Sequence, residues 1–472
     1  MSRHLDALII ISAVVLRICL TARMGVGCSL HDTGSYDGLG TAGFGAGHLG
    51  YVEYLFEYHA LPDFDPTTVM SFYNPPFYYI VSALVMGLLW SCGLPANIVG
   101  KAPTIVTCVA MCACVVVFWK LLRELEVSDR VRHVLLALAA FYPAGIWLSF
   151  TATNDALCIL LCLLAVLLVV MWRRRADDEG ADGQPRLWRR SSWLVVGAGL
   201  SFGLACATKL SAAMLAPAIA VVFLLRIWEL RAGGRWKALV APYACFLLVA
   251  VPLALAFPLY NLKTYDIPIS YVQDYADDPV FGDEVTLADR IGLPSVSQLS
   301  SSHFDSKDIS AEQNIWAQTL KSSLFDEYYV TGQGLSGPLM QVLTWVSVAL
   351  GIVLAVLACV GLFARHVMPP WQRLLIGLGA AFVFVSYLRF CFLFPHAYTQ
   401  SFRYIVVAWL LMLAAAAKGL DHVMSPATSA SAGHLSASVT SRKVARPLMA
   451  VLTCLVVVTV ILSAALYVFW VV

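Results

Sequence analysis

The protein has 472 residues, of which 60% are hydrophobic and only 13% carry a formal charge. Soluble domains carry about 25% charged residues, so this composition excludes a chain that is mostly surrounded by water. The formal net charge of +2 gives no indication of a nucleic-acid partner. Long apolar stretches recur along the chain, and we predict an all-α polytopic membrane protein.

About eleven apolar stretches are predicted to cross the bilayer. The first, 5–20, is interrupted by Arg17 and is followed by further spans, so we interpret it as a retained helix and not as a cleaved signal. The others are 102–119, 134–150, 156–172, 193–207, 210–225, 238–257, 338–362, 374–394, 404–417 and 447–472.

The basic residues indicate how this bundle is oriented. Cytoplasmic connections of membrane proteins carry an excess of Lys and Arg. Arg3 and five loops hold 21 of the 31 Lys and Arg residues, and these loops are 120–132, 173–190, 226–237, 365–373 and 418–446. We therefore expect the N-terminus and these loops to be cytoplasmic and the remaining connections to be extracytoplasmic.

One more apolar segment, 77–92, does not fit this alternation. If it crossed the membrane, the basic loop that begins at Lys120 would lie outside. We interpret it as a juxtamembrane helix at the outer interface, because Pro75-Pro76 suits the first turn of a helix and the nearby aromatic residues suit the interface. A membrane-crossing course for this segment stays open as the alternative.

Two long extracytoplasmic loops follow from this topology. The first covers about 21–100, and the second, 260–337, holds twelve Asp or Glu residues against four Lys or Arg residues. The sequence thus divides into an N-terminal membrane module (1–259), an insertion (260–337) and C-terminal membrane helices (338–472). We expect the insertion to be a small folded unit with a helix around 311–325.

The thirteen cysteines do not indicate a metal centre or a set of disulfides. Most of them lie in the apolar stretches, where cysteine behaves as a small hydrophobic residue. No Cys and His spacing is typical of a zinc site. The sequence indicates no cofactor and leaves a requirement for a divalent metal open.

Polar residues gather at the extracytoplasmic ends of the predicted helices. Ionisable groups at membrane depth are costly to bury and are therefore candidates for a function. The candidates are His31, Asp32, Tyr36, Asp37, Asn74, Asn154, Asp155, Lys209, Lys263, Arg389 and Arg403. Each also has a structural alternative, such as a helix cap for Asp155 or an extension to the lipid headgroups for Lys209 and Arg389.

The order of these residues along the chain is recognisable. Asp32 follows the first predicted span, Thr208-Lys209-Leu210-Ser211 follows the fifth, and Phe402-Arg403-Tyr404 leads into the tenth. Further short motifs are Asn74-Pro75-Pro76, Asn154-Asp155-Ala156-Leu157 and the segments 47–54 and 61–66. Together they resemble the GT-C superfamily of polyprenyl-phosphate-sugar glycosyltransferases. Within it, they are similar to bacterial glycosyltransferase family 39, to protein O-mannosyltransferases and to the lipid A aminoarabinose transferase.

Two positions depart from the pattern of that superfamily. Thr33 follows Asp32 where the family often has Glu, and Asn74 stands where the family has His before the two prolines. Thr33 bears on whether a second acid, or a metal held by an acidic pair, takes part. Asn74 bears on whether a histidine contacts the substrate.

The resemblance implies a GT-C-like membrane enzyme that moves a sugar, a mannose-like hexose, from polyprenyl phosphate to an acceptor hydroxyl on the extracytoplasmic face. The phosphate leaves without being protonated, so one base suffices, and Asp32 is the candidate. Lys209 and Arg403, followed by Lys263 and Arg389, are candidates to stabilise the charge on the phosphate. The other candidates for substrate binding are His31, Tyr36, Asp37, Asn74, Asn154 and Asp155. Direct displacement predicts inversion at the anomeric carbon.

The implied partners are the lipid-linked sugar donor, an acceptor protein, lipid or glycan, and the bilayer of a bacterial plasma membrane. Other functions stay open: a transporter or flippase of a lipid-linked substrate, a glycan polymer ligase with a diphosphate-linked donor, or a non-catalytic scaffold. A transporter would place charged residues near the bilayer midplane, whereas the candidates here are predicted to lie at one surface.

Overall fold

The computed structural model describes residues 2–28, 46–178, 190–273, 285–300, 312–325, 336–425 and 435–469, and all regular elements among them are helical. Nine of the described helices are long and apolar enough to cross a membrane. The protein is therefore an all-α integral membrane protein, and the fold class expected from composition is confirmed.

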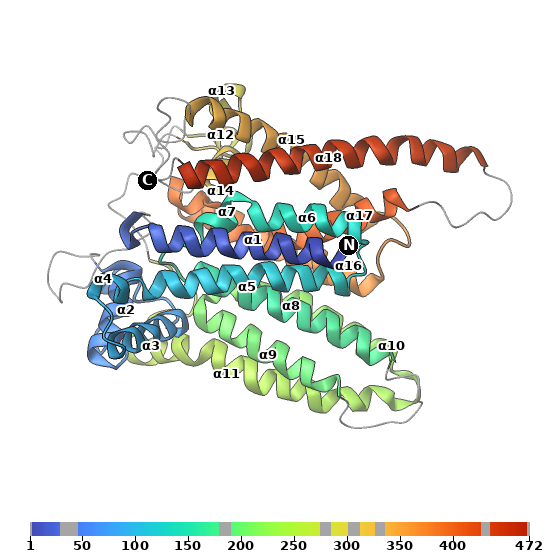
Figure 1. Ribbon diagram of the computed structural model, residues 1–472. Coiled ribbons are helices and arrows are strands. Elements are labelled where there is room, and N and C mark those ends of the chain that lie inside the picture. The colour runs from blue at the N-terminus through green and yellow to red at the C-terminus, as the bar shows by residue number, and fades with distance from the viewer. Residues whose placement is uncertain are drawn as a thin grey trace.

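The long helices run side by side along the length of the molecule (Figure 1). In chain order they are α1 (Ser2–Arg23), α5 (Ala102–Glu124), α8 (Asp155–Asp178), α10 (Ala216–Glu229), α11 (Val240–Tyr265), α15 (Ser336–Phe363), α16 (Pro370–Leu393), α17 (Val406–Met424) and α18 (Leu435–Phe469). Two 3-10 turns, Leu210–Leu215 and Phe402–Ile405, lead into α10 and α17. The apolar parts of α8 and α17 are the most buried of the nine, so these two helices form the centre of the bundle.

Two predicted spans are shorter or broken in the structure. α9 (Ser192–Thr208) has 17 residues, and α6 (Asp129–Phe141) has 13. Because Pro143 lacks an N–H and disfavours helical backbone before it, α6 ends at Phe141, Tyr142 is extended, and α7 (Pro143–Trp147) starts a new helix. All eleven predicted spans are thus at least partly helical, and nine meet the length of a membrane crossing by themselves.

The short helices gather at the end of the bundle away from the N-terminus (Figure 1). They are α2 (Gly47–Tyr58), α3 (Phe77–Ser91), α4 (Ala96–Val99), α12 (Leu287–Ile291), α13 (Val296–Ser300) and α14 (Ile315–Phe325). The segment 77–92, expected to lie at an interface, forms α3 and occupies only this end of the bundle.

Glycines let two helix pairs approach closely. A Cβ atom at Gly419 of α17 would lie 1.9 Å from the carbonyl oxygen of Leu357 in α15, and one at Gly361 would lie 2.1 Å from that of Ala415. Gly199 of α9 similarly faces the backbone of Phe246 in α11, at 2.9 Å. Small residues at such crossings let helices pack without side chains between them, which is how helices commonly associate in lipid.

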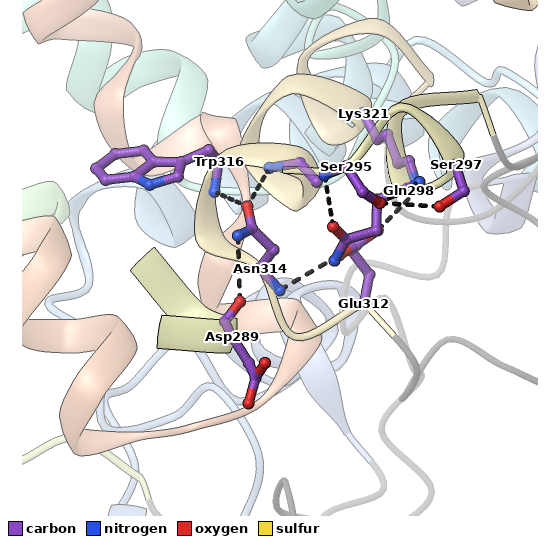
Figure 2. Close-up of polar contacts among 9 residues, drawn as sticks. Asp289, Ser295, Ser297, Gln298, Glu312, Asn314, Trp316 and Lys321 are labelled. Carbon is purple, nitrogen blue, oxygen red and sulfur yellow. Dashed lines mark hydrogen bonds and ion pairs between the residues drawn. The ribbon is translucent and has the colours of Figure 1, made fainter. Parts of the chain in front are cut away.

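The insertion is organised around Asn314 (Figure 2). Its Oδ1 accepts hydrogen bonds from the N–H groups of Trp316 and Ala317, at 3.1 and 3.0 Å, and so caps α14. Its Nδ2 donates to the carbonyl oxygens of Asp289 and Gly292 in and after α12. The helix expected around 311–325 is therefore present, and its start at Ile315 is set by this cap.

The insertion is also attached to the membrane helices. The hydroxyl of Tyr142 lies 2.9 Å from that of Ser323 in α14, and Arg290 of α12 donates to the carbonyl oxygen of Cys391 in α16, at 2.6 Å. The ammonium of Lys321, which is buried, pairs with Glu312 at 2.9 Å (Figure 2). The insertion thus covers the same end of the bundle where the short helices lie.

Candidate active site

A cavity of about 420 Å³ lies where the ends of several helices meet. Its walls come from the start of α8, the connection between α9 and α10, the ends of α11 and α16, the turn before α17 and the loop before α3. Most of the lining side chains are apolar, and a small group of polar side chains stands among them. Concave, mainly apolar sites with a few fixed polar groups are typical of ligand binding.

Three charged side chains from distant segments meet at this cavity. Nζ of Lys209 lies 2.5 Å from Oδ1 of Asp155, and Nε of Arg403 lies 3.8 Å from Oδ2 of Asp155. The side chains of Asp155 and Arg403 are only 5% and 6% exposed, and that of Lys209 is 19% exposed. We name these three residues the charged triad.

Local structure explains why the triad points into the cavity. Asp155 is the first residue of α8, and the Thr153 hydroxyl donates to its Oδ2 at 2.8 Å and accepts from its N–H at 3.1 Å. α9 ends at Thr208, and Lys209 is extended, so its side chain leaves the helix and reaches Asp155. Arg403 lies in the 3-10 turn before α17, where the chain enters the bundle.

Tyr404 supports both cations of the triad. Its ring lies under the Lys209 ammonium, 4.6 Å from the ring centre, and under the Arg403 guanidinium, at 4.9 Å. The Arg403 guanidinium also donates a 2.9 Å hydrogen bond to the Tyr404 hydroxyl. Such contacts fix long side chains in position at a partly desolvated site.

The charges of the cavity favour an anion. Among the described residues, the charged side chains that line it are Asp155, Lys209, Arg389 and Arg403, so three cations face one carboxylate. Asp155 pairs with Lys209 and Arg403, whereas Arg389 is exposed. The lining therefore carries a net positive charge, which favours an anionic ligand.

The loop that precedes α3 closes one side of the cavity through aromatic packing. The Tyr51 ring of α2 is stacked between those of Phe72 and Tyr79, at 4.4 and 4.3 Å. Burial raises the pKa of the Tyr51 phenol well above its usual value. The hydroxyl of Tyr79 is hydrogen-bonded to Nδ1 of His48 at 2.7 Å, and His48 lines the cavity.

A strap of chain after α11 forms another wall. Residues 267–272 line the cavity, and Gln273 fastens the end of this strap to the loop before α3. Its Nε2 donates to the carbonyl oxygen of Thr67 at 3.3 Å, and its Oε1 accepts from the N–H of Ser71 at 3.4 Å.

The structure brings together most of the described candidates from the sequence. Asn74, Asn154, Asp155, Lys209, Arg389 and Arg403 all line the cavity. Lys263 is exposed and is not among the described lining residues, because it lies two positions beyond the lining residue Asn261 and so points to another side of α11. His31, Asp32, Tyr36 and Asp37 lie outside the described residues, and their roles stay predictions.

His48 and Asn261 are among the polar lining residues that were missed as site candidates. His48 belongs to the segment 47–54, which entered the sequence argument only as a motif. Asn261 is a polar residue near the end of a predicted apolar helix, and the cost of burying such a residue was the signal that could have identified it. Within the described part of the chain, no three His, Cys, Asp or Glu side chains are placed to hold a metal ion.

Comparison with known proteins bears on the fold. Residues 95–265 match the model of the dolichyl-phosphate-mannose-protein mannosyltransferase family. The Archaeoglobus fulgidus oligosaccharyltransferase with zinc and sulfate aligns with a TM-score of 0.50 and 14% identity, over 97% of this chain and 53% of its own. Its apo form aligns with the same TM-score and identity, over 98% and 56%. The chain has a GT-C fold.

The GT-C resemblance expected from the motifs is thereby confirmed. The chain spans about half the length of the archaeal structures. ArnT from Cupriavidus metallidurans in the apo state aligns at 14% identity over 88% of this chain and 76% of its own, with a TM-score of 0.38. No curated protein sequence matches the chain. The family match includes Asn154, Asp155 and Lys209 and ends before Arg403.

Proposed function

We propose that this GT-C protein is a glycosyltransferase that moves a sugar, a mannose-like hexose, from polyprenyl phosphate to an acceptor hydroxyl on the extracytoplasmic face. The observation that carries the proposal is the charged triad, in which Asp155 holds Lys209 and Arg403 at a mainly apolar cavity. The matched family is named for a dolichyl-phosphate-mannose donor, which has the same combination of an apolar lipid and an anionic phosphate.

The positive charge of the cavity lining suits the increase in negative charge on the phosphate during such a reaction. The phosphodiester of the donor carries one negative charge, and the phosphate monoester that leaves carries nearly two at neutral pH. Cations that are already in place stabilise this increase without reorganising, most strongly where water is excluded. Lys209 and Arg403 are held by Asp155 and Tyr404, and Arg389 lines the same cavity.

The base in this proposal is Asp32, which would take the proton of the acceptor hydroxyl as the oxygen attacks the anomeric carbon. The bond from the anomeric carbon to the phosphate oxygen breaks, and the phosphate leaves with the electron pair, so the anomeric configuration inverts. Asp155 is a weaker candidate for this role because both of its oxygens face cations and it orients Lys209 and Arg403.

Apolar lining residues would bind the lipid part of the donor. Leu215, Phe390 and Leu393 belong to the cavity wall and come from the segments that flank the triad. Each buried methylene of an isoprenoid chain contributes about 0.8 kcal/mol. Affinity can therefore come largely from the lipid, which leaves the polar contacts to act on the transition state.

The orientation in this proposal rests on charge. The Lys and Arg-rich loops join the helix ends opposite to the cavity, and the positive-inside rule assigns those ends to the cytoplasm. Sugar transfer would then take place on the extracytoplasmic side of a bacterial plasma membrane, with the insertion beside the site where a protein, lipid or glycan acceptor would enter.

Purified protein in nanodiscs, given polyprenyl-phosphate mannose or its diphosphate-linked counterpart, tests this function. We expect release or transfer of mannose from the monophosphate donor and little from the diphosphate. Preference for the diphosphate would instead identify a polymer ligase. Movement of the donor across proteoliposome membranes without sugar transfer would identify a flippase, and either result overturns the proposal.

A further inference from the structure

Two buried amide groups in the cavity wall are left without a hydrogen bond to their oxygens. Asn154 is 1% exposed and Asn261 is 5% exposed, and both line the cavity. Among the described residues, Oδ1 of each has no hydrogen-bond donor. A buried acceptor without a partner costs about 1–3 kcal/mol, so such groups are expected to have a partner that the protein does not provide.

The orientation of the Asn154 amide is determined by its neighbour. Its Nδ2 donates to the main-chain carbonyl oxygen of Thr208 at 3.2 Å. A carbonyl oxygen can only accept, so the NH₂ group must face Thr208 and the amide oxygen must be the free end. This oxygen does not cap α8, because no N–H group of the described chain donates to it, and the Thr153 hydroxyl accepts from the N–H of Asp155.

The position of these acceptors relative to the triad identifies their ligand. Asn154 precedes Asp155 in the chain and is bonded to the residue before Lys209, so it adjoins the place where the phosphate would lie. Asn261 reaches the same cavity from α11. A sugar on polyprenyl phosphate is bonded directly to a phosphate oxygen, so its hydroxyl groups must lie next to the phosphate site.

The cationic side chains and the amide oxygens of the lining suit different parts of the donor. Lys and Arg side chains donate hydrogen bonds and cannot accept them, which suits phosphate oxygens. Amide oxygens accept and need a donor. An isoprenoid chain has no donor, and neither does an ionised phosphodiester, whereas a hexose has several hydroxyl groups.

We propose that Asn154 and Asn261 bind hydroxyl groups of the donor's sugar and set the selectivity of this site for a hydroxylated hexose over its deoxy analogues. This inference rests on the proposed function and assigns residues to its sugar. Sites built to bond a substrate hydroxyl discriminate strongly against an analogue that lacks it, because the protein group is then left buried and unpaired.

Asn261 is the better position for a test. The Asn154 side chain donates a hydrogen bond to Thr208, whereas no hydrogen bond within the described structure involves the Asn261 side chain. Asn261→Leu removes the acceptor at similar volume. Binding of polyprenyl phosphate and of polyprenyl-phosphate mannose to the full-length protein in nanodiscs is measured for wild type and variant. We expect about tenfold weaker binding of the mannose donor and a change below twofold for polyprenyl phosphate.

A matched control tests whether the loss of any buried amide weakens binding of the mannose donor. Gln372 of α16 is buried, its Oε1 also lacks a donor among the described residues, and it does not line the cavity. Gln372→Leu should leave both affinities unchanged. If Asn261→Leu lowers the thermal stability of the protein, Asn261→Ala takes its place in the same measurements.

The outcomes distinguish this inference from the proposed function. Equal weakening of both ligands by Asn261→Leu, or no weakening of either, overturns the assignment to the sugar. If wild type binds neither ligand, the proposed function itself fails. Mono-deoxy analogues of the mannose donor complete the test: wild type should discriminate against one of them, and Asn261→Leu should lose that discrimination, as a double-mutant cycle requires.

Discussion

The Lys209 ammonium lies 2.5 Å from Oδ1 of Asp155, although 54 positions separate the two residues in the sequence. The pair joins the start of α8 to the end of α9, and Arg403 adds the start of α17. Removing one partner of a buried ion pair costs about 3–5 kcal/mol, because the remaining charge is left unpaired. The triad thus stabilises the bundle and shapes the cavity, and variants must separate these effects.

Lys209→Met tests the cation that we assign to the phosphate. Arg403 still faces Asp155 in this variant, so we expect it to fold. Loss of a preorganised charge should lower kcat for sugar transfer by about 10²–10³-fold. Lys237→Met is the control. Lys237 is exposed and lies between α10 and α11, away from the cavity, so this variant should retain activity. A Lys209→Met protein with more than half of the wild-type kcat would contradict the assignment.

Asp32→Asn tests the base. The change keeps the size of the side chain and removes its ability to take a proton, so transfer to an acceptor hydroxyl should fall by about 10²–10⁴-fold. Binding of polyprenyl-phosphate mannose, measured separately in nanodiscs, should stay within twofold of wild type. Full transfer activity in this variant would show that another group accepts the proton.

Two cysteines offer a test of cavity occupancy that does not depend on turnover. Cys158 and Cys162 of α8 line the cavity, and their sulfur atoms lie 4.0 Å apart. Cys108 and Cys112 have the same spacing on α5 and do not line it. A trivalent arsenical that bridges two thiols should react with the cavity pair, and polyprenyl phosphate at ten times its Kd should slow that reaction about tenfold.

Mass spectrometry of peptides from α8 and α5 reports which pair has reacted. The α5 pair provides the internal comparison, since its reaction should not respond to polyprenyl phosphate. Equal rates at Cys158 and Cys162 with and without the lipid would show that the phosphate and its tail bind elsewhere.

Gly419→Ala tests the close crossing of α15 and α17. The added Cβ would lie 1.9 Å from the carbonyl oxygen of Leu357, so the helices must separate. Overpacking of this kind costs about 1–3 kcal/mol, and the thermal midpoint in detergent should fall. Gly351→Ala in α15 meets nothing within 4 Å and should be neutral or slightly stabilising. Equal midpoints for the two variants would disprove the crossing.

Asn314→Ala tests the cap that organises the insertion. It removes two accepted and two donated hydrogen bonds, and a lost cap costs about 1 kcal/mol. Hydrogen exchange should quicken in α12 and α14 while the membrane helices keep their protection. If exchange were unchanged there, the network in Figure 2 would not be what holds the insertion together.

The helices could be predicted because each depends on local composition. The apolar runs that became α8, α15 and α18 are long and nearly free of charge, and lipid requires helices for such segments. Hydropathy alone does not predict the break between α6 and α7. Hydropathy is continuous there, and only the backbone restriction of Pro143 divides the run.

The charged residues that line the described cavity could be named from the sequence, but their arrangement could not. Asp155, Lys209 and Arg403 stand out because each is an ionisable residue beside an apolar run. Their distances depend on how α8, α9 and α17 pack, which no local pattern contains. Asn261 escaped notice because one amide hardly changes the mean hydropathy of a long helix, and its importance appears only when the cavity next to it is known.

Gln273 binds the strap after α11 to the loop before α3 through both ends of its amide. The strap follows α11, and the loop lies between α2 and α3. Movement of either segment alone would break the hydrogen bonds of the Gln273 side chain. If an acceptor enters past the strap in the proposed function, these two hydrogen bonds would couple displacement of the strap to the loop before α3.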